Sequence, residues 1–200
     1  MHMRDMIKPT LVLFLICLVV GGAMAFTNAA TKDKIQLRIV EESEKARKSV
    51  MPDADTFEEI DMKNIQEATG ADKYAAVKEA YAAKKGGNTV GYVFLAVPDG
   101  YAGPVNIMVG IDLKGFVSGV EIGDSKETPG LGSKAKEPGF KSQYNNKKFD
   151  EINVVKRKAQ SDDEIQAISG ATITSKAVSL GVQQASWLAD ALIKNELGVK

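Results

Sequence analysis

The chain has 200 residues, in which 26 Lys and Arg balance 26 Asp and Glu, with one histidine and one cysteine. This length suits one domain with accessory segments, and the balanced charge argues against a nucleic-acid partner. A lone His2 and a lone Cys17 exclude an intrachain disulfide, zinc or iron–sulfur sites built from these residues, and histidine-dependent nucleophilic catalysis. We therefore expect no metal site and no catalytic side chain, so any redox chemistry must come from a bound cofactor.

An apolar segment, Pro9 to Phe26, contains no charged residue. As a helix it would span about 27 Å, close to the roughly 30 Å hydrocarbon core of a bilayer. Arg4 and Lys8 precede it, which favours a cytoplasmic N-terminus over residues 1–8. We expect a single-pass anchor over residues 9–26 in the cell (inner) membrane. The alternative is a cleaved signal peptide, because the segment ends in small residues.

A charged region follows the apolar segment and predicts a juxtamembrane helical stalk and connector over residues 27–72. Thr31 to Val50 has an apolar start and then a mixed-sign face, which is typical of a solvated helix. Met51 and Pro52 end this helix. A short segment from Phe57 to Ile65 and a loop or helix cap at Ala68 to Asp72 complete the connector.

The pattern in the next part of the chain, alternation from Val77 to Ala83 and then apolar runs between turn signals, predicts β-structure. The expected strands, separated by Gly- and Pro-containing turns, are Val77–Ala83, Val90–Val97, Pro104–Asp112 and Phe116–Ile122. The alanine-rich stretch Lys73–Ala83 leaves a helix open as an alternative. Two short apolar runs, Val154–Lys156 and Ile165–Ile168, are candidates for further strands.

Apolar residues at helical spacing predict an amphipathic helix from Lys176 to Leu197. Its expected buried residues are Ala177, Leu180, Val182 or Gln184, Trp187, Leu188 and Leu192. The predicted fold class is α+β, in which a mostly antiparallel sheet is packed by helices over residues 73–200.

The seven residues directly before this predicted helix, from Ser169 to Ser175, are Ser-Gly-Ala-Thr-Ile-Thr-Ser. A helix start offers unpaired N–H groups and the positive end of a dipole, so hydroxyls there can hold a phosphate or be esterified by one. Ser and Thr are also ordinary N-caps, so a plain capped helix is the alternative, with Thr174 or Ser175 as the cap.

A second motif, Glu127-Thr128-Pro129-Gly130-Leu131-Gly132, lies about 40 residues earlier. Pro129 restricts the backbone, the glycines let backbone approach a flat ligand, and Leu131 offers an apolar contact. Alone, this hexapeptide predicts only a tight loop.

Together and in this order, the two motifs resemble those of the FMN-binding domain family, and the resemblance covers roughly Val77 to Leu197. The resemblance implies that FMN is attached to Thr172 through a phosphoester bond and that the earlier loop lies against the flavin. The implied cofactor-binding residues are Thr172, Ser169, Gly170, Ala171, Thr174, Ser175, Glu127, Thr128, Pro129, Gly130 and Leu131. For Glu127 we favour a hydrogen bond to backbone over a catalytic role. Gly100 to Gly103 is similar to a glycine–tyrosine segment of the family, with a simple loop between strands as the alternative.

Further stretches, among them Ile7 to Leu13 and Lys136 to Phe140, resemble the family of G subunits of Rnf electron-transport complexes; the C subunit of the sodium-translocating NADH:quinone reductase is similar in plan. This resemblance implies a membrane-anchored electron carrier with an extracytoplasmic domain, in a ferredoxin:NAD oxidoreductase that translocates ions. The implied partners are other subunits of the complex, including another flavin-bearing membrane subunit, and a flavin transferase for maturation. The alternative is a non-redox, single-span extracytoplasmic binding or interaction module.

The chain departs from the family pattern at Gln166. The family usually has Asp three residues before the Ser of the second motif, within the pattern that the flavin transferase recognises. Because Thr172 and its immediate neighbours are intact, we expect the transferase to tolerate this glutamine.

Overall fold

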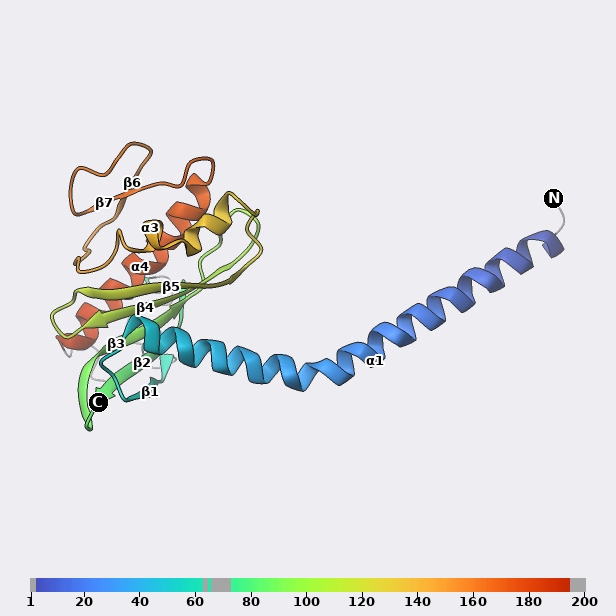
Figure 1. Ribbon diagram of the computed structural model, residues 1–200, viewed down its shortest axis with the longest axis horizontal. Helices are drawn as coiled ribbons and strands as arrows, with labels where there is room; N and C mark the ends of the chain where they lie inside the picture. Colours follow the sequence, from blue (N-terminus) through green and yellow to red (C-terminus); the bar gives the residue numbers. More distant parts are fainter. Residues whose placement is uncertain (1–2, 63–64, 66–72, 195–200) are drawn as a thin grey trace. The chain divides into compact units, whose positions relative to one another are not determined.

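The computed structural model describes residues 3–62, 65 and 73–194 (Figure 1). The chain divides into two compact units, Met1–Glu44 and Lys45–Lys200. A predicted loop or cap at Ala68 to Asp72 lies outside the described residues, as does the end of the predicted C-terminal helix beyond Lys194.

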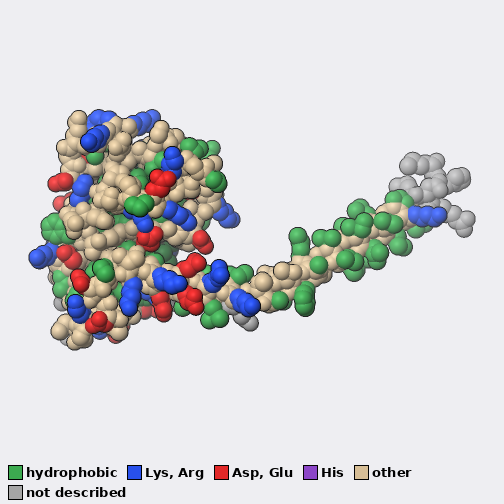
Figure 2. Space-filling view, viewed as in Figure 1, with side chains coloured by type: hydrophobic (Ala, Val, Ile, Leu, Met, Phe, Trp, Pro, Cys, Tyr) green, Lys and Arg blue, Asp and Glu red, His purple; other side chains and the backbone are tan. Residues whose placement is uncertain are grey.

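The first unit consists of one helix, α1 (Met3–Val50), whose last residues belong to the second unit. Within the described residues, one stretch, Ile7–Lys32, is long and apolar enough to cross a membrane. Figure 2 shows hydrophobic side chains along it, whereas both signs of charge mix over the visible face of the second unit. Thr27 and Thr31 donate hydrogen bonds to carbonyls four residues earlier, so these hydroxyls are satisfied within the helix. The predicted apolar helix and charged stalk are thus one continuous helix; the boundaries 9–26 and the orientation stay predictions.

Five antiparallel strands form the larger sheet of the second unit, and neighbours in this sheet are neighbours in the chain (Figure 1). The strands are β1 (Thr56–Ile60), β2 (Val77–Lys85), β3 (Asn88–Ala96), β4 (Val105–Asp112) and β5 (Val117–Ser125). The four predicted strands are confirmed, and the helical alternative for Lys73–Ala83 is wrong. β1, which the sequence analysis assigned to the connector, is one of the two edge strands of this sheet, with Thr56 opposite Lys84 and Ile60 opposite Ala80.

One face of the sheet packs against α4 (Thr172–Ile193), and the main hydrophobic core lies between them. Alternate residues of β4, Ile107 and Val109 among them, meet Val182 and Leu188 of the helix in this core. The predicted burial of Leu180 is wrong, because the buried stripe runs through positions such as Val178 and Val182 and leaves Leu180 45% exposed. Trp187 is half-buried and donates its Nε1–H to the Asp150 carbonyl at 2.7 Å.

The opposite face of the sheet is covered by the end of α1, Lys45–Val50, and by Met51. Met108 alternates with the α4-facing residues of β4 and packs with Val50 and Met51 in a second cluster. Ser118 of β5 donates a hydrogen bond to the Val50 carbonyl at 2.5 Å. A Cβ at Gly110 would overlap that carbonyl, so the glycine permits the close approach of the helix end.

Smaller elements connect the sheet to α4. They are η1 (Gly132–Lys136), α3 (Pro138–Lys141), β6 (Asn153–Val155) and β7 (Glu164–Gln166). The two predicted short strands are confirmed, and they pair in parallel, with Val154 opposite Ile165. This small sheet brings the residues after Val155 and the residues before Thr172 to the same end of α4.

Candidate functional site

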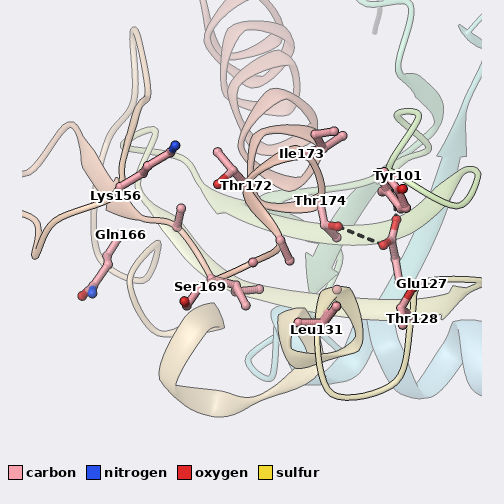
Figure 3. A pocket seen from close by; sticks show the side chains of 15 residues that line it. Tyr101, Glu127, Thr128, Leu131, Lys156, Gln166, Ser169, Thr172, Ile173 and Thr174 are labelled. Carbon is pink, nitrogen blue, oxygen red and sulfur yellow. Dashed lines mark hydrogen bonds between the residues drawn. The ribbon is translucent and has the colours of Figure 1, made fainter.

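A cavity of about 660 Å³ lies at the start of α4 (Figure 3). Its wall is built from four parts of the chain: the loop before β4, the loop after β5, the region of β6 and β7, and the first turn of α4. Most of the residues predicted from the two motifs line it: Glu127, Thr128, Leu131, Ser169, Gly170, Ala171, Thr172 and Thr174. Three predicted residues, Pro129, Gly130 and Ser175, are not in the lining. The fold therefore brings the two motifs together around one cavity.

The helix begins earlier than the sequence analysis predicted. Ala171 is the N-cap residue, without a side-chain cap, and Thr172 is the first helical residue instead of Lys176. Gly170, with φ of 77°, makes the left-handed turn into the helix. The prediction that Thr174 or Ser175 caps the helix is wrong, because both lie inside its first turn. Ser175 Oγ instead accepts the Ile168 N–H at 3.0 Å and donates to the Ala171 carbonyl at 2.9 Å.

The positive end of the α4 dipole lies at Thr172. The Ser175 N–H already donates to the Ala171 carbonyl at 3.0 Å, so the N–H groups before Ser175 are the ones without an intrahelical acceptor. Thr172 is half-buried and its side chain points toward the same side of the cavity as the exposed Lys156 (Figure 3). No ion pair joins the Lys156 ammonium to another residue in the described part of the chain. This side of the cavity is therefore suited to an anion.

Glu127 is buried in the opposite wall, with only 7% of its surface exposed. Its Oε1 accepts the N–H groups of Tyr101, at 2.8 Å, and Ala102, at 3.3 Å. Its Oε2 accepts the Thr174 hydroxyl at 2.9 Å (Figure 3). The interpretation of Glu127 as a loop glutamate bonded to backbone is confirmed.

Three apolar or aromatic side chains on this cavity are more exposed than such residues normally are in a folded domain. Tyr101 is 71% exposed, Ile173 54% and Leu131 43%, and each comes from a different segment. A site of this kind, apolar on one side with a few placed polar groups on the other, suits a flat ring that carries an anionic tail. Among the described residues, no group of three or more His, Cys, Asp and Glu could hold a metal ion.

Sequence reasoning missed Tyr101 and Lys156 as cavity residues. Tyr101 reaches the site because Glu127 holds its loop, and Lys156 reaches it because β6 pairs with β7; both are long-range contacts without a local pattern. The only signal for Tyr101 was its glycine-flanked segment, for which the sequence left a simple loop equally open. Gln166, considered only for transferase recognition, also lines the cavity, and its N–H and carbonyl are both bonded to the Gln143 side chain.

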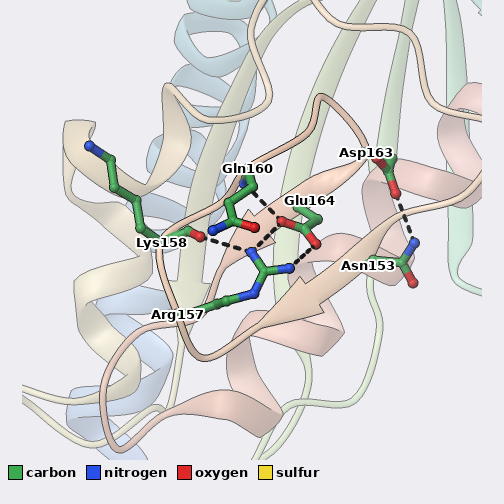
Figure 4. A network of polar contacts seen from close by, with 6 residues as sticks. All are labelled: Asn153, Arg157, Lys158, Gln160, Asp163 and Glu164. Atoms are coloured by element: carbon green, nitrogen blue, oxygen red, sulfur yellow. Dashed lines mark hydrogen bonds and ion pairs between the residues drawn. The ribbon is translucent and has the colours of Figure 1, made fainter.

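The loop that presents Lys156 is held by charged hydrogen bonds (Figure 4). Arg157 donates to both carboxylate oxygens of Glu164, at 2.7 and 2.5 Å, and the Gln160 N–H adds a third bond at 2.8 Å. The hydrogen bonds from Arg157, followed by that from Gln160, lower the pKa of Glu164 below its ordinary value. The same contact raises the pKa of Arg157. The loop is thus held by an ion pair between a half-exposed Arg157 side chain and a Glu164 side chain that is 13% exposed.

Comparison with known proteins places this site in a family. The FMN-binding domain model matches residues 100–186, a range that contains both motifs and the whole cavity lining. The model of the RnfG N-terminal region matches residues 1–50, which correspond to α1. The class defined by fold and site is therefore an FMN-binding domain that follows an apolar N-terminal helix.

Relatives that match most of the chain identify the family within this class. The G subunit of the Na(+)-translocating ferredoxin:NAD(+) oxidoreductase complex from Acetobacterium woodii is 39% identical over 181 residues, which are 88% of this chain and 87% of the relative. The proton-translocating counterpart from Clostridium ljungdahlii is 39% identical over 140 residues, covering 70% and 73% of the two chains. The G subunit of the ion-translocating oxidoreductase complex from Haemophilus influenzae is 33% identical over 171 residues, covering 82% and 79%. The chain belongs to the family of G subunits of ion-translocating ferredoxin:NAD(+) oxidoreductase complexes.

Among solved structures, the chain is similar to the C subunit of the Na(+)-translocating NADH-quinone reductase from Parabacteroides distasonis. The two are 27% identical with a TM-score of 0.47, over 57% of this chain and 61% of that one.

Proposed function

We propose that this chain is a membrane-anchored electron carrier that holds FMN through a phosphoester bond to Thr172, within a ferredoxin:NAD oxidoreductase complex that translocates ions. The observation that carries the proposal is the position of Thr172: it is the first residue of α4, half-buried, in the wall of the cavity that both motifs line. The chain's redox chemistry would be that of the flavin, which exchanges one or two electrons, while the protein supplies attachment and environment.

The residues of the cavity fit such a group. A volume of about 660 Å³ falls within the roughly 300–1,000 Å³ typical of cofactor sites. Tyr101, Leu131 and Ile173 would contact the ring. Lys156 and the free N–H groups at the start of α4 would offset part of the phosphodiester charge, at about 0.3–1 kcal/mol for the helix end. The exposed apolar side chains support this role, because a ligand ring would cover surface that is otherwise left in water.

Attachment would require a flavin transferase and an activated flavin dinucleotide. The Oγ1 of Thr172 would form the bond to phosphorus while the phosphoanhydride bond breaks. The nucleoside monophosphate would leave, and the hydroxyl proton would be released. A covalent tether would keep the cofactor on a domain outside the cytoplasm, where we place it because Arg4 and Lys8 precede the apolar segment.

The partners we propose are the other subunits of the complex, one of which would be a second flavin-bearing membrane subunit. The names of the relatives assign ion translocation to the whole complex. The apolar segment from Pro9 to Phe26 has no charged residue, and ion pathways through a membrane need polar groups. We therefore infer that this protein relays electrons and that the ion path runs through its partners.

The test is in-gel flavin fluorescence after full denaturation. The chain is expressed with a flavin transferase as wild type, Thr172→Ala and Thr89→Ala, the last a matched control that removes a threonine hydroxyl outside the cavity lining. We expect a fluorescent band for wild type and Thr89→Ala and none for Thr172→Ala. A labelled Thr172→Ala would place the bond on another residue. A dark wild type, in cells that label a control acceptor, would contradict covalent FMN and favour the non-redox binding module.

A further inference from the structure

One polar side chain of the cavity wall, the Glu127 carboxylate, accepts hydrogen bonds from more than one segment of the chain. It is buried, and its two oxygens accept hydrogen bonds from three donors, the N–H groups of Tyr101 and Ala102 and the hydroxyl of Thr174. The donors come from two segments that lie on either side of Glu127 in sequence, 25 to 47 positions away. One carboxylate thus joins the loop before β4, the loop after β5 and the first turn of α4.

The position of this carboxylate explains why residues 100 and 132 are glycines. A Cβ at Gly100 would overlap Glu127 Oε1 and would lie 2.8 Å from Val105 Cγ2. A Cβ at Gly132 would overlap Glu127 Oε2 and would lie 2.8 Å from Thr174 Oγ1. Because backbone closes on both sides of the carboxylate, Glu127 has little room to move.

The loop that Glu127 holds is also closed on itself. Gly100 N–H donates to the Gly103 carbonyl at 2.8 Å, and Val105 N–H donates to the Pro98 carbonyl at 3.0 Å. With the two bonds to Glu127, the backbone around Tyr101 is fixed while the Tyr101 ring stays exposed beside the cavity. The loop is therefore ordered although the Tyr101 ring is not buried, and its hydrogen bonds fix the position of an exposed ring.

We propose that Glu127 is a positioning residue: it clamps the Tyr101 loop to the first turn of α4 and so sets the distance between Tyr101 and the attachment residue Thr172. The geometry supports this role, because the Glu127 carboxylate is buried and its three hydrogen bonds all go to the two segments that it joins. The clamp itself is a property of the protein alone. Its effect on the cofactor rests on the proposed function.

Three substitutions distinguish a positioning role of Glu127 from a role of its charge. Glu127→Ala removes every bond of the clamp. Glu127→Gln keeps it, because the amide oxygen can accept both N–H groups and the amide nitrogen can donate to the Thr174 hydroxyl, but the charge is lost. Thr174→Val releases only α4. Glu137→Gln is the matched control, since Glu137 is an exposed carboxylate outside the cavity lining.

The first readout is amide hydrogen exchange at Tyr101 and Ala102 in the full chain, which needs no cofactor. We expect exchange at least about tenfold faster in Glu127→Ala, because two hydrogen bonds to a charged group are lost. In Glu127→Gln, Thr174→Val and the control, exchange should stay within about threefold of wild type. Wild-type exchange rates in a folded Glu127→Ala would overturn the clamp.

The second readout is the visible circular dichroism of the attached flavin in native protein, after labelling has been measured on a denaturing gel. We expect the signal to fall in Glu127→Ala and Thr174→Val and to persist in Glu127→Gln. A Gln variant that loses the signal as fully as Ala would assign the effect to the charge and overturn positioning. If Glu127→Ala does not fold, Thr174→Val carries the test, and an unchanged signal there overturns the proposal. A dark gel with the expected exchange result would reject covalent FMN and leave the clamp standing.

Discussion

The two walls of the cavity differ in how their side chains are held. The inner wall, defined by Glu127, Gly132 and Thr174, is buried, and its polar groups are satisfied within the protein. The outer wall, defined by Lys156, Gln166 and Ser169, is exposed and is held through backbone contacts and surface ion pairs. Thr172 lies between the two. The difference indicates that the inner wall sets the shape of the cavity, whereas the outer wall is open to solvent beside Thr172, as the proposed modification of that residue requires.

The largest effect is expected from breaking the inner wall at Gly132. In Gly132→Ala the new methyl group would overlap Glu127 Oε2 and crowd Thr174 Oγ1, two side-chain atoms that are hydrogen-bonded to each other and buried. We expect the free energy of unfolding to fall by about 1–3 kcal/mol, as for other overpacked sites. Denaturant unfolding of the full chain measures this loss. Gly139→Ala is the matched control, because a Cβ at Gly139 meets nothing within 4 Å. Equal stability of the two variants would contradict a tightly packed inner wall.

A smaller, local effect is expected from the outer wall when the Arg157–Glu164 pair is broken. The pKa of Glu164 is lower in the folded protein than its ordinary 4.5, so the ionised carboxylate favours the ordered loop. This stabilisation of the loop is complete at pH values above the ordinary pKa of the carboxylate. It is lost as the pH falls through the lower pKa that Glu164 has in the folded protein. We therefore expect the loop 156–163 to loosen below about pH 4.5, and Arg157→Gln to loosen it already at pH 7.

Hydrogen exchange of peptides from this loop measures the effect. The Arg157 side chain is 51% exposed and the Glu164 side chain 13%, so water partly screens the pair and we expect a smaller change in global unfolding than from the inner wall. Lys158→Gln is the matched control: it removes a positive charge from the same loop, and no ion pair involves its ammonium among the described residues. Faster exchange in both variants would assign the effect to net charge instead of to the pair.

The features that could be predicted from the sequence are those with a local pattern, and the features that depend on tertiary contacts could not be. The strands from Val77 to Ser125 follow from local alternation and from apolar runs between turn signals, and both motifs could be found because their residues are contiguous. β1 was missed because its five residues, Thr-Phe-Glu-Glu-Ile, are mostly polar and are ordered by pairing with β2. The start of α4 was placed four residues late because its hydroxyls were interpreted as caps, although Ser175 and Thr174 bond to other segments. Tyr101 and Lys156 depend on tertiary contacts, which leave no periodic signal.

The smallest effect, none within error, is expected where the family pattern is broken in the outer wall. In Gln166→Asp the backbone contacts of this position would persist, because its N–H and carbonyl bond to the Gln143 side chain independently of the residue at 166. The Gln166 side chain itself is exposed, and no hydrogen bond within the described chain involves it. The proposed acceptor, Thr172, and its neighbours are unchanged. A labelling time course with the flavin transferase should therefore give equal rates and yields for wild type and Gln166→Asp. Faster labelling of the aspartate variant would show that the enzyme reads this side chain directly and that Gln166 slows maturation, which would make the outer wall a recognition surface rather than only an open approach to Thr172.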